Sequence, residues 1–223
     1  VSQSIEFEYI RMLKELNMSI GEIETYRKDP TPAAFLKIVN EKEKEIDRQI
    51  QRLKDIKTVI QSKKERIAFC ETLREREIRI EECRPERLLV YPYHVSEDDV
   101  AQLFYHLKEI WGIEQIRMGM GSFISLDHVY EGQFDRYEGI YTVALSDKPD
   151  SDRLLRPKGT YLCGYQKGTW DQLPILYQQM LEYAAEKQLQ LTGYAYEVGL
   201  NDFVISDEAD YITKIMIRIQ ENI

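Results

Sequence analysis

Apolar side chains between residues 36 and 67 recur at alternating steps of three and four, if the polar residues Glu43, Lys57 and Lys64 are counted as members of the series. This rhythm is typical of one face of a long α-helix, and charged residues fill most of the positions in between. The segment would be about 48 Å long at a rise of 1.5 Å per residue. Its apolar stripe consists of Leu36, Val39, Ile46, Ile50, Leu53, Ile60 and Ile67.

A single helix of this kind cannot bury its stripe, so it needs a partner helix. The sequence contains no second long segment with the same rhythm. We therefore predict a coiled-coil dimerisation helix over residues 31–73, helical from 33 to about 72, that pairs with a second copy of the chain. The alternative is a helical hairpin within one chain, which the lack of a second long helix disfavours.

The segment before this helix, residues 5–28, predicts two short helices. Asn17 and Met18 interrupt the apolar spacing of the first helix. Ser19 is a good N-cap for the second helix, and Glu22 stands three residues later, as in a capping box. Asp29-Pro30 ends the second helix, because proline restricts the residue before it and cannot continue a helix.

After residue 73 the apolar period changes to two in several places, which predicts strands. Ser96 with the acidic residues after it predicts the start of a helix that Gly112 ends. A second helix is predicted from Thr169 to about Ala184. The strands are expected at 77–81, 88–93, 114–126, 138–145, 153–157, 161–167, 191–199 and 211–219.

The order of these elements is strand, helix, strand, strand, and this order occurs twice. It predicts an α+β domain over residues 74–223 with an internal pseudo-repeat, although the two halves share no obvious sequence identity. The chain as a whole would then have three parts, residues 1–30, 31–73 and 74–223.

Charge and aromatic residues are unevenly distributed. Residues 1–83 carry equal numbers of acidic and basic side chains, so the formal net charge of −9 comes from residues 84–223. The same region holds 13 of the 15 Tyr and both Trp. An acidic, tyrosine-rich domain is a poor binder of nucleic acid and is suited to organic cations. The alternative explanation is that the acidic residues only keep the protein soluble.

Other sequence features argue against a membrane-spanning, a secreted and a disulfide-linked protein. No run of eighteen apolar residues is present, so no membrane-spanning helix is expected, and the first residues do not resemble a signal peptide. Cys70, Cys83 and Cys163 have no C-x-x-C spacing, which argues against a disulfide framework or a zinc site and favours the reducing cytoplasm. The sequence predicts no cofactor and no metal site.

Three stretches together resemble a known family. Tyr9–Ile23 is similar to the end of the DNA-binding domain of MerR-family transcription regulators, and that family also places a long dimerisation helix next. Gly193–Asp202 and Tyr211–Ile217 resemble motifs of the gyrase-inhibitor-like effector-binding domain found in multidrug-sensing members. The resemblance implies a homodimer whose helices pair antiparallel, a small-molecule effector and control of promoter DNA.

The chain departs from that family in two ways. The opening helix-turn-helix and most of the wing should precede Val1, so residues 1–30 are expected to be a remnant of the DNA-binding domain. Promoter DNA is then a partner only when the missing region is present. Ala195 replaces a usual proline and Gly199 a common tyrosine, from which we expect a more open pocket wall.

The predicted ligand site centres on Glu197. Strand alternation places Glu197 and Ala195 on one face, with Tyr194 and Tyr196 on the other. A buried unpaired carboxylate is costly, and a cationic ligand would offset the cost. The resemblance implies a buried acidic residue ringed by aromatics, for which the candidates are Tyr93, Tyr141, Tyr165, Trp170 and Tyr211. The alternative is an exposed strand carboxylate paired with Lys or Arg.

Signs of catalysis are weak. The three histidines are scattered without H-E-x-x-H, and Gly121-Ser122 lacks the G-x-S-x-G frame of a nucleophile elbow. We therefore predict no catalytic residue and a ligand-responsive regulator that senses a small, apolar, cationic molecule. Two alternatives stay open. One is a stand-alone module that sequesters drugs or a protein partner, and the other is a hydrolase of the same fold that uses Glu197 as a general base.

Overall fold

A computed structural model describes residues 2–74, 76–92, 100–145 and 153–221. The chain divides into two compact units, Val1–Ile56 and Lys57–Ile223, and the helix α3 contributes residues to both. Each unit is described by itself.

The first unit consists of α1 (Ser2–Glu15), α2 (Ile20–Lys28) and the beginning of α3 (Pro32–Cys70). The predicted capping box is confirmed at the start of α2. The Ser19 hydroxyl accepts from the Glu22 amide at 3.3 Å, and the Glu22 carboxylate accepts from the Ser19 amide at 2.7 Å. The small core of this unit consists of Leu13, Met18, Ile23 and Tyr26, with Ile10, Ala34, Phe35 and Ile38 packed against it.

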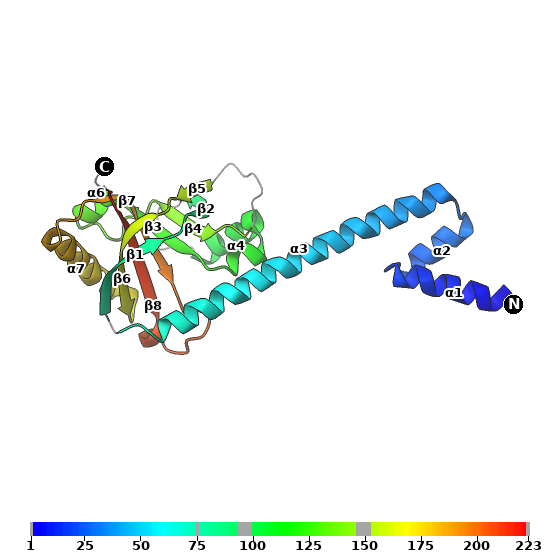
Figure 1. Ribbon diagram of the computed structural model, residues 1–223, viewed down its shortest axis with the longest axis horizontal. Helices are drawn as coiled ribbons and strands as arrows, with labels where there is room; N and C mark the ends of the chain where they lie inside the picture. Colours follow the sequence, from blue (N-terminus) through cyan, green and yellow to red (C-terminus); the bar gives the residue numbers. More distant parts are fainter. Residues whose placement is uncertain (1, 75, 93–99, 146–152, 222–223) are drawn as a thin grey trace. The chain divides into compact units, whose positions relative to one another are not determined.

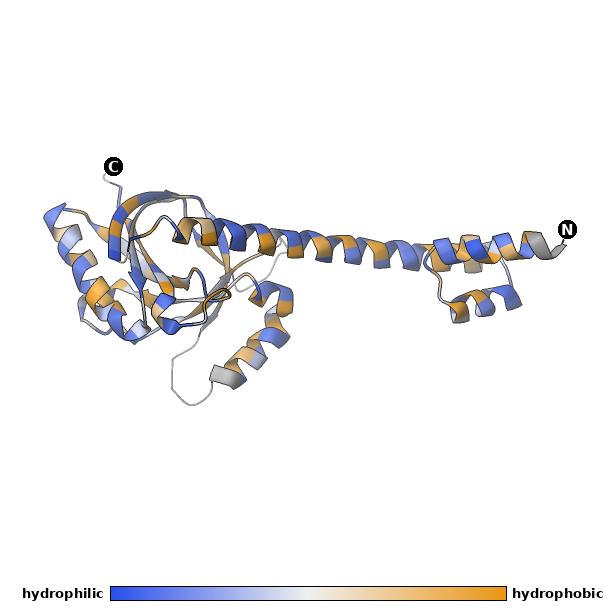
Figure 2. Cartoon of the chain, turned by 90° about the horizontal axis from the view of Figure 1, so that it is seen from below, coloured by the Kyte–Doolittle hydropathy of each residue, from blue (hydrophilic) through white to orange (hydrophobic). Residues whose placement is uncertain are grey.

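The long helix α3 extends over 39 residues and confirms the predicted helical segment within two residues at each end. Figure 2 shows hydrophobic residues recurring among hydrophilic ones along its length. No other helix of the described residues exceeds 14 residues. Five stripe residues are exposed within one chain, namely Leu36, Ile46, Ile50, Leu53 and Ile60. The stripe is therefore available to a partner, and the dimer itself stays a prediction.

The second unit is built on an eight-stranded antiparallel sheet with the order β1-β6-β8-β7-β3-β4-β2-β5, which curls into a half-barrel (Figure 1). The α+β class is confirmed. Its strands are β1 (Arg76–Cys83), β2 (Glu86–Pro92), β3 (Gly121–Ser125), β4 (Gly139–Val143), β5 (Arg153–Arg156), β6 (Gly159–Lys167), β7 (Leu191–Gly199) and β8 (Ile212–Ile219). Its helices besides α3 are α4 (Val100–Trp111), α5 (Ile113–Ile116), α6 (Leu126–Tyr130) and α7 (Leu173–Glu186), with short 3-10 turns at Trp170–Gln172 and Glu208–Asp210.

The sheet order contains the predicted pseudo-repeat. The strands β6, β8 and β7 mirror β2, β4 and β3 about the junction between β7 and β3, and α7 corresponds to α4. The first strand of each half is exchanged, because β1 pairs with β6 and β5 pairs with β2. The pair β3–β7 joins the two halves into one sheet, and this exchange links them again at its two edges.

The prediction of one strand over residues 114–126 is wrong for most of its length. Only Gly121–Ser125 is a strand, while Ile113–Ile116 forms α5. Gly112 ends α4 with a positive φ of 82°, and Ile113 and Ile116 stand at helical spacing. Ser125 then caps α6, accepting a hydrogen bond from the His128 amide at 3.4 Å. The residues 96–99 of the predicted helix start lie outside the described part of the chain.

Two buried clusters occupy the two faces of the sheet. On one face, which we call the α7 face, the helix α7 packs against β6, and Met180 and Leu176 fill the space where a Cβ of Gly164 would lie. The opposite face holds a cluster rich in tyrosine: Leu88, Phe123, Tyr141, Tyr161, Cys163, Tyr165, Tyr196, Leu200, Ile212 and Met216. Side chains of successive strand residues alternate between these faces.

Candidate functional site

Glu197 lies on β7, at the junction between the two halves of the sheet. Its backbone partner across β3 is Ser122. Ala195 belongs to the α7-face cluster, whereas Tyr196 belongs to the tyrosine-rich cluster and, with Tyr194, packs on the ring of Phe123. The side chains of β7 therefore alternate between the two faces as predicted, and the side chain of Glu197 points toward α7.

The carboxylate of Glu197 is 5% exposed and accepts three hydrogen bonds from hydroxyl groups. The Tyr177 hydroxyl on α7 donates to Oε1 at 2.6 Å. The Tyr137 hydroxyl donates to Oε2 at 3.0 Å, and the Ser122 hydroxyl donates to the same oxygen at 3.3 Å. An exposed carboxylate paired with Lys or Arg, the alternative considered from the sequence, is excluded in this structure because the residue is buried.

Burial controls the protonation of this group. Loss of hydration raises the pKa of Glu197 from 4.5 to about 7, and the three hydroxyl donors oppose that rise only in part. The pKa values of Tyr177 and Tyr137 are raised as well, chiefly by burial and then by the nearby charge of Glu197. Near neutral pH the site is therefore balanced between a neutral acid and a buried anion.

Aromatic rings cover the carboxylate. Phe134 stacks on Tyr177 with ring centroids 4.9 Å apart and planes within 11° of parallel. Phe134 and Tyr137 belong to the segment 131–138 that connects α6 to β4. The sequence does not predict these aromatic neighbours, because Tyr177 has the helical spacing of an ordinary core residue and nothing in the spacing of 131–138 indicates a site.

Two of the predicted ring residues lie on the same side of β7 as Glu197. Gly199 is two residues beyond Glu197, so its missing side chain would point to that face. The Tyr211 hydroxyl occupies the place where this Cβ would stand. Trp170 packs edge-on against Tyr211 with centroids 5.7 Å apart and is 65% exposed.

Gly199 therefore does not open the wall as expected, because Tyr211 fills the space. Burial raises the pKa of Tyr211, with smaller contributions from the charges of Asp202 and Glu197.

The other predicted ring residues do not gather around Glu197. Tyr141 and Tyr165 are buried in the tyrosine-rich cluster on the opposite face. The Tyr165 hydroxyl donates to Glu81 at 2.5 Å, and its ring lies 5.4 Å from that of Phe69. Tyr93 lies outside the described residues. The sequence could not separate these faces, because one step of register moves a side chain to the other side of a sheet.

Comparison with known proteins places this domain. Residues 76–220 match the family of GyrI-like small molecule binding domains. The chain belongs to the GyrI-like family. This finding confirms the effector domain recognised from the motifs around Glu197 and Tyr211.

Two relatives extend over nearly the whole chain. The "Multidrug-efflux transporter 2 regulator" of Bacillus subtilis (strain 168) is 26% identical, over 96% of this chain and 80% of that protein. A cryo-electron microscopy structure of an EcmrR–DNA complex has a TM-score of 0.52 at 18% identity and covers 99% of this chain and 84% of that one. The second similarity concerns the fold, including a long helix before the curled sheet. Within the described residues, no helix is both long and apolar enough to cross a membrane.

Proposed function

We propose that this GyrI-like chain is a ligand-responsive transcription regulator of the cytoplasm that binds a small, apolar, cationic molecule at Glu197. It acts on promoter DNA as a homodimer formed through α3. The observation that carries this proposal is the buried carboxylate, whose partners among the described residues are hydroxyl groups and not a cation.

Ionising the buried carboxyl group of Glu197 is costly. A rise in pKa from 4.5 to about 7 corresponds to about 3 kcal/mol of lost preference for the charged form. A ligand cation that enters the site recovers this free energy, because it replaces the lost hydration by a direct charge interaction. A neutral ligand of the same shape gains nothing from it, so the site selects for positive charge.

The apolar body of the ligand needs aromatic surface. Phe134, Tyr137 and Tyr177 supply it directly at the carboxylate, and Trp170 with Tyr211 supplies it farther along β7. Aromatic faces bind organic cations both by their apolar area and by the negative potential over the ring. Because Glu197 is only 5% exposed, a ligand reaches it when the segment 131–138 moves aside.

Dimerisation through α3 is supported by its exposed stripe. Burying one large aliphatic side chain stabilises an association by about 1.5–3 kcal/mol, and five stripe residues are available. In the second unit the last turn of α3 packs on the sheet, where Phe69 contacts Tyr165. A ligand that shifts the sheet would thereby bias the helix pair and the DNA-binding parts attached to it.

Isothermal titration calorimetry with a matched pair of ligands tests the proposal. The pair is a lipophilic quaternary ammonium ion and its neutral isostere, in which carbon replaces nitrogen. We expect Glu197→Gln to weaken binding of the cation at least about tenfold, or 1.4 kcal/mol, and to leave the neutral ligand unchanged. Glu131→Gln, which removes an exposed acidic charge, is the control and should bind like the wild type. Equal weakening of both ligands by Glu197→Gln would contradict the proposal.

One observation favours a second function. A carboxylate with a pKa of about 7 is suited to act as a general base near neutral pH, so the same site could serve a hydrolase. Incubation of a bound ester with the wild type and with Glu197→Gln separates the two functions. Turnover that disappears in the variant favours the enzyme, and binding without turnover favours the sensor.

A further inference from the structure

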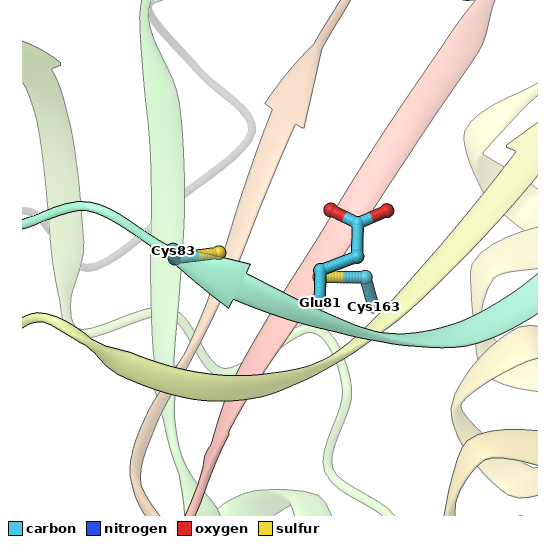
Figure 3. Close-up of side chains that lie close together, drawn as sticks. All are labelled: Glu81, Cys83 and Cys163. Atoms are coloured by element: carbon cyan, nitrogen blue, oxygen red, sulfur yellow. The ribbon is translucent and has the colours of Figure 1, made fainter.

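Two cysteines and a glutamate meet between β1 and β6, on a part of the sheet that the proposed ligand site does not use. Glu81 and Cys83 are two residues apart on β1, so their side chains share a face. Cys163 stands on the neighbouring strand β6, opposite Arg79. The sulfur atoms of Cys83 and Cys163 and a carboxylate oxygen of Glu81 all lie within 4.8 Å of one another (Figure 3).

We propose that Glu81, Cys83 and Cys163 form a binding site for a thiophilic divalent cation, with Zn²⁺ as the best match. Two thiolates and a carboxylate supply three ligands of a tetrahedral zinc site, and water supplies the fourth. With Zn–S bonds of about 2.3 Å and Zn–O bonds of about 2.1 Å, the ligand atoms would stand about 3.5–3.8 Å apart. The observed separations therefore require shifts of about 1 Å, which side-chain rotation provides.

The carboxylate is already oriented by neighbours, as metal ligands in proteins usually are. One oxygen of Glu81 accepts from the Tyr165 hydroxyl at 2.5 Å, and the other accepts from Lys214 Nζ at 2.8 Å. A carboxylate has about four acceptor positions, so both bonds leave room for a cation. Tyr165 and Lys214 are then positioning residues.

The two thiols differ in a way that suits metal binding. Cys163 is fully buried and Cys83 is partly exposed, so a cation can enter from the side of Cys83. Binding of the cation would release the thiol protons, because the thiolate is the form that binds metal.

Local charge makes the site depend on both thiols. Lys214 is bonded to Glu81, and Arg79 lies 3.3 Å from the same carboxylate, so the carboxylate alone is already neutralised. A divalent cation is favoured there only when Cys83 and Cys163 both contribute negative charge. This requirement excludes hard cations such as Mg²⁺, which prefer oxygen ligands.

The site is independent of the proposed function. Cys163 and Tyr165 belong to the tyrosine-rich cluster, on the face of the sheet opposite to the side chain of Glu197. The third cysteine, Cys70, is not a member of the group, and burial raises the pKa of its thiol. Cys70 therefore offers a matched control.

The test is a Zn²⁺ titration of the reduced full chain in competition with a chromophoric chelator. We expect one tightly bound Zn²⁺ per chain. Cys83→Ser and Glu81→Gln should each weaken binding by at least about 10–100-fold, the loss typical of outer-shell changes, while Cys70→Ser keeps the wild-type affinity. Cys83 is partly exposed, so its substitution leaves the core intact.

Cobalt substitution gives a second measurement. Co²⁺ bound to thiolates absorbs in the near ultraviolet. If Cys83→Ser still binds Co²⁺, we expect the intensity of this band to fall by about half, because one of two thiolates is lost. If Cys83→Ser no longer binds Co²⁺, we expect the band to be absent. The proposal is overturned if the wild type binds Zn²⁺ no more tightly than Cys83→Ser, or if Cys70→Ser loses as much affinity as Cys83→Ser.

Discussion

Ser122 and Glu197 face each other across the pair β3–β7, where the two halves of the sheet meet, and their side chains are hydrogen-bonded at 3.3 Å. The first half thus contributes a hydroxyl to the carboxylate of the second. The two remaining donors, Tyr137 and Tyr177, also come one from each half. The buried acid is therefore assembled only when both halves are folded.

Removing the charge of Glu197 should stabilise the protein at alkaline pH. The folded pKa of about 7 lies above the unfolded value of 4.5, so the folded state holds a proton that the unfolded state has lost between these values. Stability of the wild type therefore decreases as pH rises through this window, by about 2–3 kcal/mol. We expect urea unfolding to show Glu197→Gln gaining this amount relative to the wild type between pH 4.5 and pH 8. A pH-independent difference would argue against a buried ionisable carboxyl.

Binding of a lipophilic cation should strengthen with pH. Only the ionised form of Glu197 attracts the ligand, and with a pKa of about 7 the ionised fraction rises about tenfold between pH 6 and pH 8. Calorimetric titrations with a quaternary ammonium ion should give a dissociation constant about ten times lower at pH 8. Glu197→Gln should show no such trend, and an equal trend in that variant would assign it to another group.

The Tyr177 hydroxyl should matter more than that of a neighbouring tyrosine on the same helix. Tyr177→Phe removes the 2.6 Å hydrogen bond to the carboxylate, which costs about 1.5–3 kcal/mol at pH 8, where Glu197 is charged. Without this donor the pKa of Glu197 should rise further. Tyr183→Phe on α7 is the control and should change the free energy of unfolding much less. Similar losses in both variants would show that the bond to Glu197 contributes little.

The close contact between Gly199 and Tyr211 predicts a steric penalty. Gly199→Ala places a methyl group in the space occupied by the tyrosine ring and should destabilise the fold by about 1–3 kcal/mol. The same substitution should be nearly neutral in a Tyr211→Ala background, which a double-mutant cycle measures. Gly21→Ala, with nothing within 4 Å, should instead stabilise α2 slightly. An additive cycle would rule out the contact as the cause.

The exposed stripe of α3 predicts a concentration-dependent dimer. Leu53→Lys, at a stripe position that is 65% exposed in one chain, should place a charge in the helix–helix interface and shift the protein toward monomer. Glu41→Lys changes charge away from the stripe and should leave the dimer intact. Light scattering and analytical ultracentrifugation distinguish these outcomes, and a wild-type chain that is monomeric at micromolar concentration would disprove the dimer.

The elements that could be predicted from the sequence are those with a strong period. The rhythm from Leu36 to Ile67 fixed the helix α3, and alternation around Glu197 gave the face of its side chain. The exchange of β1 and β5 between the halves was not foreseen, because strand order depends on pairings between distant segments. The sequence predicts a strand where the short α5 lies, because four residues with an apolar residue at each end fit the period of a strand as well as that of a helix.

The surroundings of the sites could not be predicted for the same reason. Tyr137 is 60 residues from Glu197 and joins it only through the fold. Tyr141 and Tyr165 are predicted beside Glu197 but lie on the opposite face of the sheet. The sequence alone does not determine the register of their strands, and the register decides the face of each side chain. Cys83 and Cys163 have no metal-binding spacing along the chain, and only the pairing of β1 with β6 brings them together.

The exchanged strands determine which half of the sheet is connected to α3. β1 follows α3 after a few residues, yet it is bonded along its whole length to β6, in the half that carries Glu197. The C-terminal end of α3 is thus connected through β1 to the half of the sheet that holds Glu197, although about 120 residues separate β1 from Glu197 in the chain. A chain cut between β4 and β5 would yield two fragments that each lack an outer strand, so neither is expected to fold alone.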